Sequence, residues 1–275
     1  MRLTRHARRR LGAVRLAAAD VRIRRRMRHR LRAWQRTAPA PPAPHATTDL
    51  ATTVVVPCFN HAPFLPLAVE SLLGQTLSTF DTVLVDDAST DGTSRLLEGL
   101  ADALRRHGEV TVIRHRRNAG QAASLNEAFE ASVTPLVTVL NDDDWLTSTT
   151  LEVMVAAHRS HRELAAVGSH SRWFAGGGRP PADAVPAAGI RWFGPEDIPR
   201  LREPNDLNMT HSGMTVSKEA WRAVGGYRPD ARTRVVPYSD RDLQLRVAAI
   251  ARVAVLDAPL VWWRSDSSVD AGINS

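Results

Sequence analysis

Short apolar runs alternate with segments of helical spacing from residue 52 onward. Four runs rich in β-branched residues predict strands, at 52–57, 82–86, 110–114 and 136–140. The three segments between them predict helices, at 64–76, 93–106 and 121–131. Because unbroken apolar strands that alternate with helices are typical of a parallel sheet covered on both faces, the pattern predicts an α/β fold. Ligands of such folds bind beyond the carboxyl ends of the strands, and polar residues follow each of these four strands.

The second half of the chain is less regular. Its apolar spacing predicts three further helices, at 151–161, 218–224 and 240–250. Three further strands are predicted at 165–174, 253–256 and 260–263. The residues from 175 to 189 are rich in Gly, Pro and Ala and predict a loop.

The first 48 residues differ sharply in composition from the rest. They contain 14 arginines and one acidic residue, a net charge of +13, whereas residues 49–275 carry a net charge of −6. Prolines at 39, 41, 42 and 44 predict an extended linker. We therefore divide the chain into a basic, helical or disordered tail (1–37), a proline-rich linker (38–49) and a folded domain (50–270).

Two roles stay open for the tail. A basic, weakly amphipathic segment such as residues 1–36 can lie on an anionic membrane surface. It can equally be a solvated or partner-binding arm. Nucleic-acid binding is disfavoured, because the basic surplus is confined to the tail.

Several classes of protein are excluded by features that the chain lacks. Its single cysteine, Cys58, cannot build a disulfide framework or a cysteine-based metal site. No apolar run reaches the roughly 18–20 residues that span a bilayer, and no signal peptide is visible. We therefore expect a cytoplasmic protein, with peripheral contact at the inner face of the membrane as an option. A dinucleotide-binding glycine fingerprint after the first strand and a P-loop are both absent, so nicotinamide dehydrogenases and P-loop phosphotransferases lose their main support.

Three consecutive carboxylates, Asp142 to Asp144, follow the fourth predicted strand. Adjacent carboxylates repel one another, so placing them together at a buried strand end costs free energy unless a cation neutralises them. Oxygen ligands of this kind suit Mg²⁺ or Mn²⁺, often with phosphates as further ligands. The alternative is an exposed acidic turn or a helix N-cap, because aspartate favours both.

A second acidic pair, Asp86 and Asp87, ends the second predicted strand. A carboxylate at this place can accept the imide N–H of a pyrimidine base and so select a nucleotide. The alternative is turn and cap chemistry, since Ser89, Thr90 and Asp91 can cap the following helix.

Taken together, these segments resemble glycosyltransferase family 2, a large group of inverting enzymes with the GT-A fold. The resemblance covers roughly residues 52–146 and rests on segments that occur in the family's order: Val54–His61, Leu73–Thr76, Val83–Thr93, Asn118–Gly120, Leu125–Asn126 and Leu140–Trp145. Weaker matches are Lys218–Tyr227 and Ser239–Arg246. The resemblance implies a Rossmann-like, mostly parallel central sheet with helices on both faces.

The resemblance also implies roles for single residues. Those expected to bind the nucleotide are Pro57, Phe59, Asn60, Asp86, Asp87, Asn118, Gly120, Asn126, Asn141 and Asp142. In the family's Asp-x-Asp signature, Asn141 stands at the place of the first acid, which faces the donor ribose, and an amide can still hydrogen-bond a hydroxyl. Asp143 stands at the place of the metal ligand. Asp144 is a second metal candidate, because Asp142 and Asp144 also form an Asp-x-Asp pair.

The general base of the family is the aspartate of a Glu-Asp pair, which here reads Ser239-Asp240. One carboxylate opposite the donor anomeric carbon has to take the proton of the acceptor hydroxyl, and Asp240 stands at that place. The alternative is that Asp240 only caps the helix that follows.

These inferences lead to one expected function. The chain is expected to move a sugar from a nucleotide-diphosphate donor, most simply a UDP-sugar, to an acceptor hydroxyl with inversion of configuration, using Mg²⁺ or Mn²⁺. The resemblance suggests a carbohydrate or lipid-linked acceptor in cell-surface polysaccharide or glycolipid synthesis. A sugar nucleotidyltransferase is disfavoured, because a glycine-rich basic loop should then replace residues 57–61. A non-catalytic nucleotide-sugar-binding or scaffold protein stays open, since Asn141 and Ser239 both depart from the family pattern.

Overall fold

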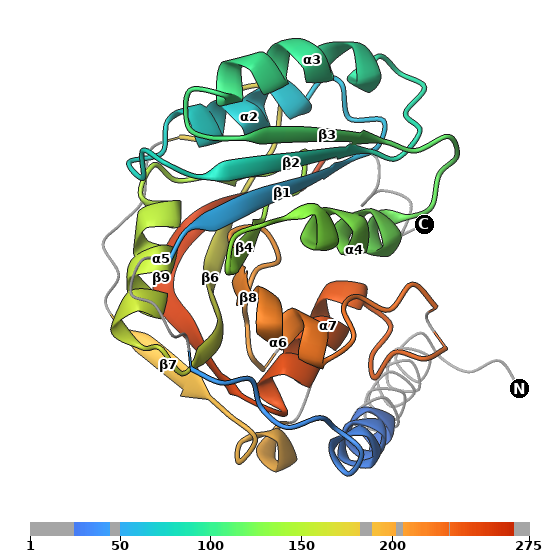
Figure 1. The fold of residues 1–275 in the computed structure, drawn as a ribbon, viewed down its shortest axis with the longest axis vertical. Helices are drawn as coiled ribbons and strands as arrows, with labels where there is room; N and C mark the ends of the chain where they lie inside the picture. The colour runs from blue at the N-terminus through green and yellow to red at the C-terminus, as the bar shows by residue number, and fades with distance from the viewer. Residues whose placement is uncertain (1–24, 45–49, 182–188, 202–205, 231, 267–275) are drawn as a thin grey trace, which may run out of the picture.

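A nine-stranded sheet runs through the centre of the molecule (Figure 1). The computed structural model describes residues 25–44, 50–181, 189–201, 206–230 and 232–266. The strands are β1 (Thr52–Cys58), β2 (Asp81–Asp86), β3 (Val110–Arg114), β4 (Leu136–Val139), β5 (Trp145–Leu146), β6 (Leu164–Phe174), β7 (Ile190–Phe193), β8 (Thr215–Ser217) and β9 (Arg252–Arg264). The helices are α2 (Leu65–Leu73), α3 (Thr93–Leu104), α4 (Gln121–Ala131), α5 (Thr150–Ser160), α6 (Lys218–Ala223) and α7 (Ser239–Ala248), with a 3₁₀ turn at Ile198–Arg200.

The first half of the sheet is parallel, in the order β3-β2-β1-β4. Every residue of β1 is buried, as its uninterrupted apolar run predicts. Alternate side chains of β1 enter different cores: Val54 packs with α2 and α3, and Val55 packs with α4. Figure 1 shows these helices on opposite faces of the sheet. The predicted α/β class with both faces covered is therefore confirmed.

The second half of the sheet is mixed. Strand β8 pairs antiparallel with both β4 and β6, whereas β6 pairs parallel with β9. Strand β9 is one element of 13 residues, where the sequence predicts two separate strands. It continues through Pro259 because β6 stays beside it, with shifts of register that absorb the break in the apolar pattern.

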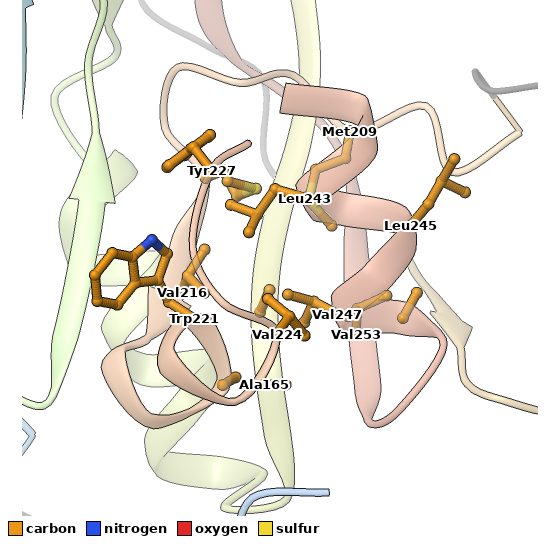
Figure 2. Close-up of a cluster of buried hydrophobic side chains, with 14 of the residues drawn as sticks. Ala165, Met209, Val216, Trp221, Val224, Tyr227, Leu243, Leu245, Val247 and Val253 are labelled. Atoms are coloured by element: carbon orange, nitrogen blue, oxygen red, sulfur yellow. The ribbon is translucent and has the colours of Figure 1, made fainter. Parts of the chain in front are cut away.

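The core of this second half lies between the sheet and helices α6 and α7. Figure 2 shows side chains from both helices converging, among them Trp221 and Leu243, with Val216 of β8 in the same cluster. Inside this core Asp242 and Arg246 form a fully buried ion pair, with 2.7 Å between Oδ2 and Nη2. A buried pair of this kind requires its remaining hydrogen bonds to be satisfied, and neighbouring backbone groups satisfy them here.

Those backbone groups belong to two separate segments. Arg246 donates to the carbonyl oxygens of Val224, at 2.6 Å, and Gly226, at 2.7 Å. Asp242 Oδ1 accepts the N–H of Val235 at 2.5 Å. The ion pair therefore ties α7 to the turn that follows α6 and to the segment that leads into α7.

Part of the basic tail packs on this core. Residues 25–35 are helical, and Met27 and Leu31 are at most 1% exposed, within the core cluster that also contains Val235. Arg30 Nη1 donates to the carbonyl oxygen of Arg234 at 2.6 Å. The helix therefore uses its apolar side against the protein. The weakly amphipathic sequence of this segment does not by itself predict such packing. The membrane expectation for residues 1–24 lies outside the described residues.

Within the described ranges, no helix combines the length and the apolar character that crossing a bilayer requires.

Candidate functional site

The loops that follow β1, β2, β3 and β4 meet at one edge of the sheet, as the strand pattern predicts. Phe59 N–H donates to Asp142 Oδ2 at 3.0 Å, which joins the first loop to the acidic loop 141–144. Asn60 N–H donates to Ser89 Oγ at 3.1 Å, which joins the first loop to the second. Gln121 Nε2, at the start of α4, donates to Asn141 Oδ1 at 3.1 Å. These contacts bring together residues that lie up to 83 positions apart in the chain.

Asp142 points into the protein. Its side chain is 7% exposed, and Oδ1 lies 2.7 Å from His61 Nδ1. Burial raises the pKa of Asp142, and the contact with His61 opposes that rise. Burial by itself would lower the pKa of His61, but the hydrogen bond to Asp142 and the charges of Asp142, Asp143 and Asp91 together raise it. Asp142 thus anchors the acidic loop to the loop after β1.

Asp144 is buried on the other side of the same loop. It is 1% exposed, and its Oδ2 accepts from Ser212 Oγ at 2.5 Å and from Asn141 Nδ2 at 3.1 Å. Its Oδ1 accepts the backbone N–H of Arg264 at 3.0 Å. Burial and the neighbouring Asp143 charge raise the pKa of Asp144 to about 8. Both oxygens of Asp144 are used inside the protein, which weighs against its predicted role as a metal ligand.

Asp143 lies between these two buried carboxylates and is half-buried. One ligand atom from each of His61, Asp142 and Asp143 lies within 4.8 Å of the others, and this set is a candidate cation site. A carboxylate with further oxygen or imidazole donors at this spacing fits a divalent cation such as Mg²⁺ or Mn²⁺. The geometry favours Asp143 over Asp144 as the carboxylate ligand.

Arg264, at the end of β9, contacts the backbone of the acidic loop. Its guanidinium lies between the rings of Phe64 and Phe174, 4.4 and 4.3 Å from the ring centroids. Its Nε donates to the carbonyl oxygen of Asp143 at 3.0 Å. A charged group held between two aromatic faces loses little mobility when it forms this hydrogen bond. Arg264 is therefore a positioning residue for the acidic loop.

Ser212 and Gly213 form the other support of the acidic loop. Ser212 Oγ accepts the N–H of Asn141 at 3.0 Å while it donates to Asp144. Gly213 has a φ of +77°, and a Cβ at this position would lie 2.8 Å from Val261 Cγ2. No side chain larger than hydrogen fits there without a shift, so the turn at 211–213 requires glycine.

Asp86 and Asp87 are both buried, and they organise the neighbouring loops. Asp87 accepts the N–H groups of Ala119, at 2.7 Å, and Gly120, at 2.8 Å, and His115 Nδ1 lies 2.6 Å from its Oδ1. Burial would raise the pKa of Asp87, but these hydrogen bonds outweigh burial and lower it. Asp86 accepts from Ser89 N–H at 2.9 Å and from the hydroxyl of Ser94. The contact of Asp86 with Ser89 matches the turn alternative, whereas α3 has Gly92 as its N-cap and no side-chain cap; the base-reading role stays a prediction.

The other predicted nucleotide residues fall into different environments. Phe59 is 37% exposed and Asn118 is exposed, so both can face a ligand. Asn60 has a φ of +56°, and its Oδ1 accepts Thr90 N–H at 2.7 Å, which fixes the turn after β1. Pro57 is buried in β1.

Asn126 and Asn141 are occupied by protein contacts. The side-chain amide of Asn126 makes two hydrogen bonds of 2.8 Å with the backbone N–H and carbonyl of Tyr227, so it joins α4 to the turn after α6. Asn141 Oδ1 accepts from Gln121 Nε2 at 3.1 Å and its Nδ2 donates to Asp144. Both amide atoms of Asn141 therefore contact protein groups, and its contact with the donor ribose stays a prediction, while Asn126 joins α4 to the backbone of Tyr227.

Asp240 lies in the first turn of α7 and is half-buried. The N-cap residue of this helix is Tyr238, without a side-chain cap, so Asp240 does not cap α7 as the alternative reading proposed. Its charge acts on two buried neighbours. It adds to burial in raising the pKa of Tyr227, and it opposes the burial that lowers the pKa of His211. His211 Nε2 and Tyr227 Oη are 3.0 Å apart, so a buried pair stands near the predicted base.

The comparison with known proteins begins with a family model described as glycosyl transferase family 2, which matches residues 53–223. EpsE of Bacillus subtilis (strain 168) is 28% identical over 198 residues, which are 70% of this chain and 65% of EpsE. A PGL/p-HBAD biosynthesis glycosyltransferase of Mycobacterium tuberculosis (strain ATCC 25177 / H37Ra) is 26% identical over 200 residues, 70% of this chain and 68% of the relative. The match to EpsE thus spans just under two thirds of that protein's length.

Solved structures share the fold at low sequence identity. S. aureus TarS (residues 1–349) in complex with UDP-GlcNAc has a TM-score of 0.60 at 18% identity, covering 80% of this chain and 60% of TarS. The mannosyltransferase PcManGT from Pyrobaculum calidifontis was solved in complex with GDP-Man and Mn²⁺. It has a TM-score of 0.56 at 21% identity, and the match covers 88% of this chain and 67% of PcManGT. These likenesses confirm the GT-A type of fold that the sequence predicts.

The His115 contacts predict a pH-dependent contribution to stability. Burial would lower the pKa of His115, but hydrogen bonds to Asp87 and Glu127 outweigh burial and raise it. A raised pKa stabilises the fold fully below the unfolded value of about 6.5, and this contribution is lost as pH rises through the folded value. His115→Gln should therefore lower the free energy of unfolding more at pH 6 than at pH 9, as measured by urea denaturation. His29→Gln, at an exposed position, is the control, and an equal loss at both pH values for His115→Gln would contradict the prediction.

Proposed function

The chain belongs to glycosyltransferase family 2, and we propose that it transfers a sugar from a nucleoside-diphosphate donor to an acceptor hydroxyl. One observation carries the proposal. Of the three carboxylates that end β4, two are consumed by hydrogen bonds inside the protein, and Asp143 alone is left at the carboxyl edge of the sheet. This is the edge where α/β folds bind ligands.

We take the donor to be a UDP-sugar. The support is the likeness of fold to TarS, which was solved with UDP and with UDP-GlcNAc. PcManGT, with a similar fold, was solved with GDP-Man, so a guanine nucleotide is the competing donor. The exposed Phe59 and Asn118 are the residues best placed to contact the nucleotide, and Asp87 shapes the Ala119–Gly120 turn beside them.

The cation proposed for this site is Mg²⁺ or Mn²⁺, held by Asp143. When bound, it would neutralise the charge that develops on the departing diphosphate. The protein's own contribution is to fix Asp143: Arg264 holds its carbonyl oxygen, and Ser212 holds the backbone N–H of Asn141. A carboxylate fixed in this way needs little reorganisation to bind a cation.

Asp240 is the proposed general base. It is half-buried in the first turn of α7, and it would accept the proton of the acceptor hydroxyl as that oxygen attacks the anomeric carbon. Attack on the face opposite the departing diphosphate gives inversion of configuration. Ser239, at the place of the family's preceding acid, leaves Asp240 to carry this role alone.

We further propose that the acceptor is a carbohydrate or lipid-linked molecule at the inner face of the membrane. The mycobacterial relative is a PGL/p-HBAD biosynthesis glycosyltransferase, which supports a glycolipid or polysaccharide product. The helix at residues 25–35 packs its apolar side against the protein and leaves basic residues on its exposed side. These residues are Arg25, Arg28, His29 and Arg32, and together with Arg36, directly after the helix, they line one surface hollow. Such a face can bind anionic lipid by charge alone.

Nucleotide binding should show as a shift in melting temperature. A ligand that binds only the folded state raises the melting temperature by mass action. We expect UDP with Mn²⁺ to give the largest shift among UDP, GDP, dTDP and CDP. Asp143→Ala should remove the part that requires the metal, and Asp102→Ala, at an exposed carboxylate of α3, is the control. If no nucleotide shifts the melting temperature of the wild type, the donor-site proposal fails.

Replacing the base should slow turnover strongly and leave nucleotide binding unchanged. Asp240→Asn keeps the size of the side chain and removes its ability to take a proton, so kcat should fall by about 10²–10⁴-fold. The shift in melting temperature with UDP and Mn²⁺ should stay as in the wild type, and release of UDP in the presence of acceptor is the measured rate. Equal turnover in Asp240→Asn and wild type would remove Asp240 from the mechanism. Nucleotide binding without any transfer by the wild type would support the non-catalytic alternative.

The basic face predicts binding to anionic vesicles. Each basic residue near such a surface contributes about 1 kcal/mol, so Arg28→Glu with Arg32→Glu should weaken partitioning by roughly 30-fold or more. The matched control reverses two arginines at the end of α3, Arg105→Glu with Arg106→Glu. Sedimentation with phosphatidylserine-containing and neutral vesicles measures the effect. Equal sedimentation of the two double variants would refute a role for this face.

A further inference from the structure

His61 has a fixed orientation beside the acidic loop. It follows β1, its side chain is 6% exposed, and Nδ1 lies 2.7 Å from Asp142 Oδ1. Asp142 is itself held through its other oxygen by the N–H of Phe59. The ring also packs edge-on against Phe64, with 5.8 Å between centroids. Three separate contacts therefore set where the second ring nitrogen points.

That second nitrogen, Nε2, is buried and has no hydrogen-bond partner among the described residues. A buried polar atom without a partner costs about 1–3 kcal/mol, so such atoms are rare and call for an occupant. Asp142 cannot satisfy it, because Asp142 already engages Nδ1.

A cation is the occupant that the surroundings favour. Ligand atoms of His61, Asp142 and Asp143 lie within 4.8 Å of one another. Metal–ligand bonds of about 2.0–2.2 Å allow two ligands of one ion to be separated by up to about 4.4 Å. That spacing refers to one ring nitrogen of His61 and not to Nε2 in particular, so for His61 Nε2 and Asp143 to share an ion the Asp143 carboxylate has to turn toward Nε2.

The pairing of His61 with Asp142 has the form of a metal-binding histidine. Such histidines almost always donate the N–H of their other ring nitrogen to a carboxylate, which fixes the tautomer and the ring orientation. In His61, Nδ1 faces the Asp142 carboxylate, and no group in the described part of the chain pairs with Nε2.

We infer that His61 Nε2 is a ligand of the divalent cation at this site, together with Asp143, and that Asp142 orients the imidazole. The inference rests on the proposed function and adds a nitrogen ligand, from the loop after β1, to a site otherwise assigned to the acidic loop. Imidazole ligands favour transition metals, whereas Mg²⁺ prefers oxygen ligands. The chain should therefore select Mn²⁺ over Mg²⁺ more strongly than the carboxylates alone would.

Pulsed electron paramagnetic resonance of the full chain loaded with Mn²⁺ tests this assignment. A directly bound imidazole gives a ¹⁴N modulation in the spin-echo envelope, and we expect that modulation in the wild type. It should vanish in His61→Gln, whose dissociation constant for Mn²⁺ should rise about tenfold or more while that for Mg²⁺ changes less. Asp142→Asn should keep the modulation and weaken Mn²⁺ about tenfold, which is the usual effect of losing a supporting carboxylate. His161→Gln, at a side chain that is 40% exposed after the end of α5, is the matched control and should behave as the wild type.

Two outcomes would overturn the inference, and they differ in what they imply for the function. If Mn²⁺ binds and Asp143→Asn abolishes binding, but the wild type shows no ¹⁴N modulation, the acidic loop holds the ion alone and the proposed transferase stands. If the wild type binds no Mn²⁺ with or without UDP, both the ligand assignment and the metal-dependent function fail. Should His61→Gln not fold, the wild-type spectrum decides by itself.

Discussion

The free-energy cost of burying two carboxylates determines how the acidic loop after β4 is held in place. Asp142 and Asp144 are both buried, and a buried carboxylate destabilises the fold unless donors satisfy it. The two acids are buried against different segments of the chain, so they take their donors from different places. Asp142 finds them in the loop after β1, and Asp144 finds them in Ser212 and Arg264. Satisfying both acids draws three distant segments together and leaves Asp143 between them.

The same reasoning explains which parts of the fold the sequence could predict. Strands β1, β2 and β4 are buried on both faces, so their apolar runs stand out from the helices between them, whereas the edge strand β3 is only partly buried. Strands β5 and β8 have only two and three residues, too few to show any periodicity. They exist because longer neighbours offer hydrogen bonds, which is a property of the assembled sheet and not of the segment.

The candidate site divides in a similar way. The polar residues at the strand ends could be predicted from the sequence. The acidic loop follows β4, and Asp240 lies at the start of α7, as the apolar pattern predicts. The partners could not be read, because His61, Ser212 and Arg264 lie between 68 and 120 positions from the carboxylates they contact. Asn126 shows the converse: a residue expected at the nucleotide is taken up by the backbone of Tyr227, 101 positions away.

The packing of the helix at residues 25–35 on a late part of the chain has a consequence during synthesis on the ribosome. Arg30 contacts Arg234, so the helix emerges from the ribosome 204 residues before the surface that receives it. At about 5–20 residues per second, Met27 and Leu31 stay uncovered for roughly 10–40 s. During that interval the dense positive charge of the same segment opposes association between nascent chains. The arginines thus protect, during synthesis, an apolar face that the finished protein hides.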